Sequence, residues 1–250
     1  MSDTVTVRQA TGADAAAVAG VMCRALQAAY LGVEHVAGAG PLGGSQIARG
    51  TQLPRGSDVP ADRRRLAVLT PDDLVDGARA ALEADDPSDR TLVAVVDAEV
   101  VGFHRLRLDA DHTTRPAAST GEVASLYVDP AAWQAGSGAR LLEEGLDRLA
   151  RHGCRQAWLW VADENDRAKR FYRRRGFVPD GTTESQRLQP WGVDLGFDLT
   201  VVRLVCDLPP SDPEAHGDAS AGHDAGIHDD PPPAELGPVG SAGSSKRPST

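Results

Sequence analysis

A strand, a glycine loop and an amphipathic helix follow one another between residues 121 and 153. The strand reads GEVASLYVD, the loop QAGSG and the helix ARLLEEGLDRLARHG. Ala139, Leu142, Leu146 and Leu149 recur every three or four residues, which is the spacing of one helical face. The first turn of such a helix leaves several backbone N–H groups without partners, and glycines in front of it let a ligand approach closely. This stretch therefore predicts either a plain turn or a seat for an anionic group.

Two phosphate-binding motifs can be compared with this loop. A P-loop requires GxxxxGK followed by Ser or Thr, and no lysine follows the glycines here. A dinucleotide fingerprint requires GxGxxG and an acidic residue about 20 positions later. In this chain the third glycine position is Leu141, and the acid would fall near a strand end at Asp163. Neither motif fits, so the loop by itself is interpreted as a turn more readily than as a phosphate seat.

Strand-like and helix-like segments alternate as far as residue 207. Strands are predicted at 5–10, 91–97, 99–109, 121–129, 155–162, 177–184 and 197–207. Helices are predicted at 15–33, 70–83, 137–152 and 166–175. Asp97 and Ala98 are expected to form the tight turn of an antiparallel hairpin. This order predicts an α/β (α+β) fold, with a mixed and mostly antiparallel central sheet flanked by helices.

Composition divides the chain into two parts. From residue 208 onward the sequence is rich in Pro, Gly, Ser and Asp and has no aromatic residue; seven acids and two bases give it a net charge of −5, half of the −10 of the whole chain. Such a segment buries too little apolar surface to offset its chain entropy. We predict one ordered domain over 1–207, with a loop-like insertion at about 32–65, and a disordered acidic tail over 208–250.

The composition also argues against several classes of partner. A net charge of −10 disfavours a nucleic-acid surface, which needs a basic face. No apolar run is long enough for a membrane span, and Asp3 and Arg8 interrupt the region that a secretory signal would need. We therefore expect a cytoplasmic protein without a membrane partner. Three scattered cysteines without a CxxC, and irregularly spaced histidines, predict no metal site.

The segment after the predicted helix 137–152 narrows the choice of protein family. A strand, QAWLWVAD, is followed by NDRAKRFYRRRGF, in which Ala168, Phe171 and Tyr172 share one helical face. Taken with VRQATGADAAAVAGVMCRALQAAY, GEVASLYVDP and WQAGSGARLL, this segment resembles the GNAT superfamily of N-acetyltransferases. The resemblance covers about residues 3–180. One departure concerns Trp133, since the family often has Arg or Gln three residues before the first glycine.

The resemblance implies that the sheet splays open between two parallel strands and that acetyl-CoA lies in the gap. The pyrophosphate would bind mainly to backbone N–H groups of the glycine loop, so Trp133 need not disturb it, and the pantetheine arm would pair with strand 121–129. Asn165 is similar to the family's pantetheine-contacting asparagine, and its position also predicts a helix N-cap. No metal is expected. The residues thereby expected to contact acetyl-CoA are Leu126, Tyr127, Val128, Trp133, Gln134, Ala135, Gly136, Ser137, Gly138, Ala139 and Asn165.

The implied reaction is attack by a neutral amine on the thioester carbonyl. It requires a base for the ammonium, a donor for the oxyanion and an acid for the departing thiolate. Tyr172 resembles the family's tyrosine acid, and its unperturbed pKa of about 10 is not far above the thiol value of about 8.5. Glu122 is the candidate base, directly or through water, and a backbone N–H near 126–128 would stabilise the oxyanion. The plain alternatives are that Tyr172 only packs beside Phe171 and that Glu122 is a solvated strand residue.

Three further side chains have structural explanations. His104 lies in a predicted strand and is expected to be structural rather than catalytic. Trp158 and Trp160 share one strand face and are expected in the core, although one of them could wall the acceptor pocket. The resemblance implies that the acceptor is selected by residues 26–80 and by residues 181–200, which carry little pattern.

The leading hypothesis is therefore an acetyl-CoA-dependent N-acetyltransferase acting on a small-molecule or protein amine. An alternative is an acyl-CoA-binding regulatory or sensing module without turnover, which would have no need to keep Tyr172 together with Asn165. A nucleotide-binding or structural protein is a third interpretation, and it predicts no stabilisation by CoA. No nucleic-acid or membrane partner is expected, and a homodimer is compatible with the sequence.

Overall fold

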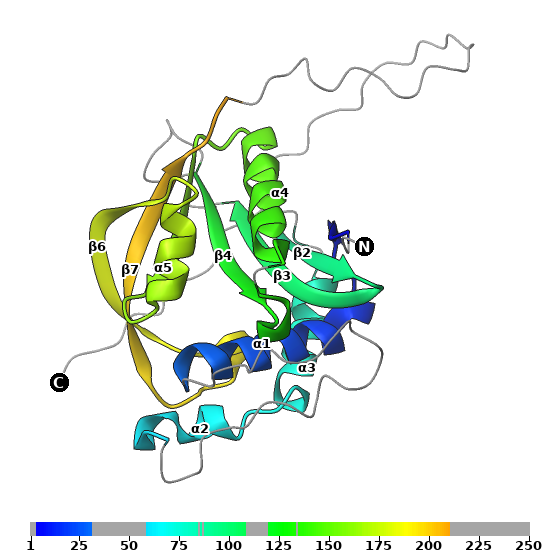
Figure 1. Cartoon of the computed structure of the whole chain (residues 1–250), viewed down its shortest axis with the longest axis vertical. Helices are drawn as coiled ribbons and strands as arrows, with labels where there is room; N and C mark the ends of the chain where they lie inside the picture. Colours follow the sequence, from blue (N-terminus) through cyan, green and yellow to red (C-terminus); the bar gives the residue numbers. More distant parts are fainter. Residues whose placement is uncertain are drawn as a thin grey trace, which may run out of the picture. The chain divides into compact units, whose positions relative to one another are not determined.

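Within the described part of the chain, seven strands form one sheet in the order β1-β2-β3-β4-β5-β7-β6 (Figure 1). β4 and β5 are parallel, and every other neighbouring pair is antiparallel. The predicted mixed, mostly antiparallel sheet is therefore confirmed. The strands are β1 (Thr6–Gln9), β2 (Asp89–Val96), β3 (Glu99–Leu108), β4 (Thr120–Val128), β5 (Gln156–Ala162), β6 (Val178–Arg187) and β7 (Asp198–Asp207).

The computed structural model describes residues 4–31, 59–84, 86, 88–108, 120–133 and 135–210. All of them fall within one compact unit, Met1–Ser211. The predicted acidic tail over 208–250 lies almost entirely outside the described residues, as does most of the predicted insertion at about 32–65. The end of that insertion is described: Ala61–Arg63 form a 3-10 turn, and α2 (Arg64–Ala67) follows.

Four helices of two turns or more accompany the sheet, and they cover both of its faces. In Figure 1, α4 and α5 lie in front of the sheet. Leu92 and Ala94 of β2 belong to the core beneath α4, whereas Val93 belongs to the core beneath α1 and α3. Because successive strand residues point to opposite faces, the two sets of helices lie on opposite sides of the sheet. The prediction that helices flank the sheet is confirmed. These helices are α1 (Ala15–Tyr30), α3 (Asp72–Glu83), α4 (Ser137–Arg151) and α5 (Asp166–Arg173).

The hairpin of β2 and β3 turns at Asp97 and Ala98, as the sequence predicts. Their φ values are +48° and +66°, so both residues lie in the left-handed region typical of a two-residue type I′ turn. Val96 pairs with Glu99 on either side of the turn. The turn thereby fixes the register of β3, the strand on which β4 is built.

β4 and β5 pair over only three residues each before they diverge (Figure 1). The paired segments are Thr120–Glu122 in β4 and Gln156–Trp158 in β5. Beyond them, among the described strands, residues 123–128 pair only with β3 and residues 159–162 pair only with β7. Backbone groups that face the gap therefore lack a strand partner, which favours an extended ligand that can pair with a strand edge. The predicted splay between two parallel strands is confirmed.

Candidate functional site

The glycine loop and the first turn of α4 form an open surface rich in backbone N–H groups. Gly136 precedes α4 with a φ of +86°, in the left-handed region that favours glycine. A Cβ on Gly136 would have no described atom within 4 Å, so the space around it is open. Ala135 is exposed, and Gln134 lies outside the described residues. Because the first N–H groups of a helix lack intrahelical acceptors and carry the positive end of its dipole, this surface can bind an anion.

The first turn of α4 also packs directly on the end of β4. A Cβ on Gly138 would lie 3.3 Å from Cγ2 of Val128, so little space separates the helix from the strand. Ser137 is 1% exposed, and its Oγ has no hydrogen-bond partner among the described residues. A buried hydroxyl without a partner is costly, so a ligand that offers it a partner would be bound more favourably. Ala139 follows as a half-buried residue of the same turn.

Trp133 ties the loop to β4 and to α5. Its indole Nε1 donates to the backbone oxygen of Val128 at 2.9 Å, which fixes the orientation of the ring. The guanidinium carbon of Arg167 lies 3.3 Å from the centroid of that ring, a close cation–π contact. The loop residue that departs from the expected pattern is therefore an anchor between two elements. No local sequence pattern pairs it with Arg167, because the two residues are separated by α4 and β5.

The three predicted contact residues at the end of β4 use their side chains for packing. Leu126 and Val128 are half-buried and pack against the core beneath α4. Tyr127 lies on the opposite face against Phe103, with ring centroids 5.4 Å apart. Burial raises the pKa of Tyr127 to about 12, so this phenol is neutral near pH 7. A ligand in the gap would therefore bind to the backbone N–H and C=O groups of these residues.

Asn165 caps α5, as its position predicts. Its Oδ1 accepts a hydrogen bond from the backbone N–H of Ala168 at 3.0 Å. Its Nδ2 makes no hydrogen bond within the described part of the chain. The cap therefore leaves an amide donor at the end of β5, where the gap between the two strands is widest.

Tyr172 lies on the buried face of α5 and is 8% exposed. Its ring meets those of Phe171 and Phe177 edge-on, with centroid distances of 5.2 and 5.6 Å. Burial is the main cause that raises the pKa of Tyr172 well above its ordinary value, with a further rise from Tyr127 and a lowering by Arg175. The phenol is therefore a proton donor at neutral pH, but proton transfer to a thiolate is more uphill than for an unperturbed tyrosine.

The three tyrosines of the chain influence one another electrostatically. Burial first, and then Tyr127, raises the pKa of Tyr30, and Tyr172 adds to the rise. These phenols come from α1, β4 and α5, so folding brings together residues that lie far apart in the sequence. Sequence reasoning identified two of them. It missed Tyr30, because a tyrosine near the end of an amphipathic helix is typical of an ordinary core residue.

Glu122 lies at the opposite end of β4 from Tyr127. It stands where β4 still pairs with β5, opposite Trp158, and its carboxylate is 3.3 Å from Nη1 of Arg107. At about 3.3 Å per strand residue, Glu122 and Tyr127 are roughly 15 Å apart along the strand. Arg107 also lies 3.5 Å from Asp89. The carboxylate is thus part of an ion-pair network, and as a base for chemistry near Tyr127 it would act through water.

An arginine that sequence reasoning missed joins the 3-10 turn before α2 to the turn before α5. Arg63 contacts both carboxylate oxygens of Glu164, at 2.7 and 2.9 Å, and donates to the backbone oxygen of Tyr30 at 2.8 Å. Its guanidinium also lies over the rings of Tyr30 and Phe197, at 5.9 and 5.4 Å from their centroids. Glu164 directly precedes Asn165, so this arginine holds the turn that presents the cap. A long-range ion pair of this kind leaves no spacing pattern in the sequence.

The structural explanation expected for His104 agrees with its surroundings, whereas of the two tryptophans expected in the core Trp160 only packs against it and Trp158 lies in neither core cluster of the described residues. His104 is fully buried beneath α4, with Nδ1 2.9 Å from the backbone oxygen of Leu141. Burial lowers the pKa of His104 to about 4. Trp158 and Trp160 share one face of β5 and meet edge-on at 6.4 Å, both half-buried. None of the three is placed to exchange protons with a ligand in the gap.

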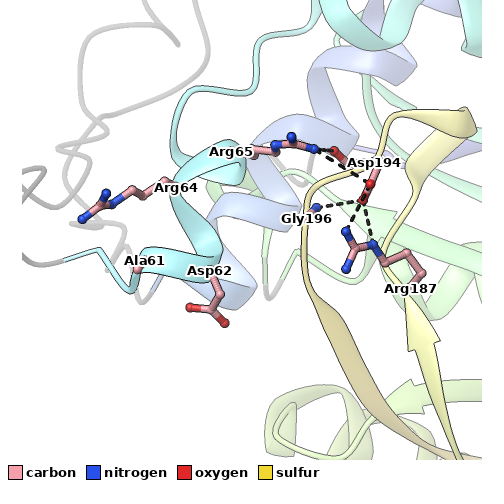
Figure 2. Close-up of a pocket in the computed structure, with 7 residues that line it drawn as sticks. All are labelled: Ala61, Asp62, Arg64, Arg65, Arg187, Asp194 and Gly196. Atoms are coloured by element: carbon pink, nitrogen blue, oxygen red, sulfur yellow. Dashed lines mark hydrogen bonds and ion pairs between the residues drawn. The ribbon is translucent and has the colours of Figure 1, made fainter.

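A separate hollow of about 290 Å³ lies between the α2 region and the segment joining β6 to β7 (Figure 2). Asp194 is its centre: the carboxylate accepts from Arg187 and from the backbone N–H of Gly196, and Arg65 lies alongside. In Figure 2 the side chain of Arg64 points away from this cluster. The hollow falls within the two segments expected to select the acceptor, and it shares no residue with the glycine loop.

The described residues contain neither a membrane-spanning helix nor a cluster of metal-binding side chains. No helix there combines the length and hydrophobicity needed to cross a membrane. Nor do these residues contain a cluster of three or more His, Cys, Asp or Glu side chains that could hold a metal ion.

The strands, the glycine loop and the helices that form this site lie in a region that is similar to known proteins. Residues 63–177 match the model of the acetyltransferase (GNAT) family. A mycothiol acetyltransferase of Acidimicrobium ferrooxidans is 40% identical over 89 residues, covering 36% of this chain and 28% of that protein. An uncharacterised N-acetyltransferase of Mycobacterium tuberculosis is 33% identical over 105 residues, covering 42% of this chain and 63% of that protein. The chain thus spans less than two thirds of the length of these relatives.

Solved structures with the same fold extend the likeness over most of the described chain. The PaiA N-acetyltransferase of Thermoplasma acidophilum, solved in complex with coenzyme A, is 16% identical with a TM-score of 0.51 and covers 82% of this chain and 99% of that one. A GCN5-related N-acetyltransferase of Rhodopseudomonas palustris is 17% identical with a TM-score of 0.54, covering 83% and 98%. At such low identity the likeness shows the fold alone.

Proposed function

We propose that this chain transfers an acetyl group from acetyl-CoA to a primary amine, because its residues 63–177 match the model of the acetyltransferase (GNAT) family. One observation carries the proposal: β4 and β5 part after three paired residues, and the N-terminal turn of α4 lies against the end of β4. This arrangement offers an extended gap with unpaired strand edges and, at one end, a surface suited to an anion.

The shape and chemistry of acetyl-CoA fit this arrangement. Its pantetheine arm carries amide groups that can pair with the free edge of β4, and its pyrophosphate suits the N–H groups of the glycine loop. The buried Oγ of Ser137 and the Nδ2 of Asn165 have no hydrogen-bond partner among the described residues, and such a ligand would supply one to each. The proposed contact residues remain those of the loop, the end of β4, and Asn165.

Each step of the proposed reaction is assigned to a group of this chain. When bound, acetyl-CoA supplies the thioester whose carbonyl carbon the amine attacks. Glu122 accepts a proton from the acceptor ammonium through water, since it lies at the far end of β4, and a backbone N–H near 126–128 stabilises the oxyanion. Tyr172 donates a proton to the departing thiolate. Its raised pKa keeps it protonated, and the transfer, which is uphill, becomes less unfavourable as negative charge develops on sulfur.

The packing of Tyr172 favours a second candidate function. A tyrosine held edge-on between Phe171 and Phe177 is also a good core residue. If that is its only role, the protein is an acyl-CoA-binding module without turnover, which keeps the loop and the gap but transfers nothing.

Two measurements made side by side separate these functions. Release of free thiol from acetyl-CoA is followed across a panel of amines, and the shift in melting temperature with CoA is recorded for the same preparations. We expect the parent to show both, and Tyr172→Phe to keep the melting shift while its kcat falls about a hundredfold. Tyr30→Phe is the matched control, since it removes another buried phenol. A melting shift without turnover on any amine would favour the binding module.

A further inference from the structure

We infer that Arg167, held flat against the indole of Trp133, binds a phosphate group of CoA. The inference rests on the proposed function and deepens it, because it names a side-chain contact for the anionic end of the ligand. Three features of the described residues carry it: the fixed position of the guanidinium, its unused hydrogen-bond donors, and its place beside the first turn of α4.

The position of the guanidinium is fixed by two contacts in series. The indole of Trp133 is anchored by its 2.9 Å hydrogen bond to the backbone oxygen of Val128. The guanidinium of Arg167 then stacks at 3.3 Å from the centroid of that ring. Because both planes are held, little side-chain entropy remains to be lost when a ligand binds.

The stacked guanidinium has no acidic partner. Within the described part of the chain, Arg167 makes no hydrogen bond and no ion pair. The neighbouring Asp166 is engaged by Lys169 at 3.2 Å, so it does not neutralise the charge. Stacking on a ring uses the flat face of a guanidinium and leaves its in-plane N–H donors free for bidentate contact with an oxyanion.

A second guanidinium adds to this uncompensated charge. Burial first, and then repulsion from Arg170, lowers the pKa of Arg167. The side chain of Arg170 likewise makes no hydrogen bond or ion pair with any described residue. Two close cations without a carboxylate are unfavourable alone, and a phosphate placed between them and the loop would relieve the repulsion.

The position of Arg167 along α5 brings this charge to the glycine loop. Arg167 and Phe171 lie four residues apart, on the same face of the helix. The ring of Phe171 lies 3.6 Å from the point that a Cβ of Gly138 would occupy, so this face of α5 packs against the first turn of α4. Arg167 lies one turn earlier on that face, over Trp133. A phosphate bound to the free N–H groups of the loop would therefore lie next to the guanidinium.

Calorimetric titration with CoA tests the contact without requiring turnover. We expect Arg167→Gln to raise the Kd for CoA about tenfold or more, which is the loss typical of a charge-assisted hydrogen bond. Arg173→Gln is the matched control: it removes the same charge from an exposed position on another face of α5, and the Kd should change by less than twofold. Melting temperatures without ligand check that both variants fold as the parent does.

Dephospho-CoA distinguishes the two kinds of phosphate in the ligand. If Arg167 binds the pyrophosphate, Arg167→Gln weakens CoA and dephospho-CoA equally. If it binds the 3′-phosphate, the loss appears with CoA alone. Trp133→Leu should weaken CoA less than Arg167→Gln does, and the double variant should lose no more than Arg167→Gln, because the indole acts through the guanidinium.

Several outcomes would overturn the inference. An unchanged or lower Kd for Arg167→Gln would show that the stack only ties α5 to the loop, or that it covers the ligand site. Equal losses in Arg167→Gln and Arg173→Gln would show a general effect of charge. If the parent bound neither CoA nor dephospho-CoA, the proposed function itself would fail, whereas a parent that binds beside an unaffected Arg167→Gln refutes this contact alone.

Discussion

The carboxylate of Glu122 lies 3.3 Å from Nη1 of Arg107, on the part of β4 that still pairs with β5. The ion pair holds the carboxylate at the closed end of the gap, at the opposite end of β4 from Tyr127. Arg107 is shared with Asp89, which lies 3.5 Å away on β2. Substitution of Asp89 removes a carboxylate from Arg107 without removing the proposed base, so it serves as a control for substitution of Glu122.

Glu122→Gln is predicted to lower kcat by about a hundredfold while leaving the Kd for CoA unchanged, because a general base acts on the amine and not on the cofactor. Asp89→Asn removes a carboxylate from the same arginine and should leave kcat within about twofold. Steady-state kinetics with saturating acetyl-CoA measure both. Equal rates for the parent and Glu122→Gln would assign the carboxylate to the ion-pair network alone.

Gly136 offers a test of the loop that separates charge from shape. Asn and Asp have nearly the same size, and both tolerate the left-handed region better than most residues, so each should strain the φ of +86° similarly. Gly136→Asp places a negative charge beside the proposed pyrophosphate and should raise the Kd for CoA about tenfold more than Gly136→Asn does. Calorimetry measures the two constants. Equal Kd values for Gly136→Asp and Gly136→Asn would show that the pyrophosphate of CoA does not bind at this loop.

The buried His104 should make stability depend on pH in a defined window. Its pKa is lowered to about 4 in the folded protein, against about 6.5 when unfolded, so the unfolded chain binds the extra proton first as the pH falls. The stabilisation is complete above pH 6.5 and is lost as the pH falls towards 4, with a slope of up to about 1.4 kcal/mol per pH unit.

His104→Gln keeps an N–H for the backbone oxygen of Leu141 but does not titrate. Urea unfolding of the parent and the variant at pH 7, 6, 5 and 4.5 gives the difference in free energy of unfolding. This difference should shrink as the pH falls. A difference that stays constant would place the parent's acid sensitivity elsewhere.

Gly145 should resist a substitution that usually helps a helix. Gly to Ala in a helix interior commonly gains about 1 kcal/mol. Here the added Cβ would overlap with the imidazole ring of His104, so Gly145→Ala is predicted to destabilise by about 1–3 kcal/mol. In a His104→Ala background the clash is gone and the same change should become neutral or stabilising. Chemical denaturation of the parent, the two single variants and the double variant gives the free energy of unfolding of each. If Gly145→Ala changed that free energy equally with and without His104, the clash would be ruled out.

The features of the fold that the sequence predicts correctly are those that depend on neighbouring residues. The helix expected at 137–152 is observed at Ser137–Arg151, and the hairpin turn at Asp97 and Ala98 is placed correctly, because caps, periodicity and turn residues act over a few positions. Asn165 was likewise recognised as a cap from its place before α5.

The parts that sequence reasoning missed depend on contacts across elements. The stack of Arg167 on Trp133 and the pairing of Arg63 with Glu164 each join segments that only the folded sheet brings together. The raised pKa of Tyr172 is of the same kind, since it arises from burial, which a motif does not report. A motif locates a functional group, but the surrounding packing sets its acidity.

Transfer of a labelled acetyl group is the most direct test of the central claim. The parent is incubated with acetyl-CoA labelled in the acetyl carbons and a panel of primary amines, and the products are analysed by mass spectrometry while free thiol is counted. The account predicts one labelled N-acetyl amine for each thiol released, with the rate reduced in Tyr172→Phe. Thiol release without an acetylated amine, or CoA binding without either product, would contradict it.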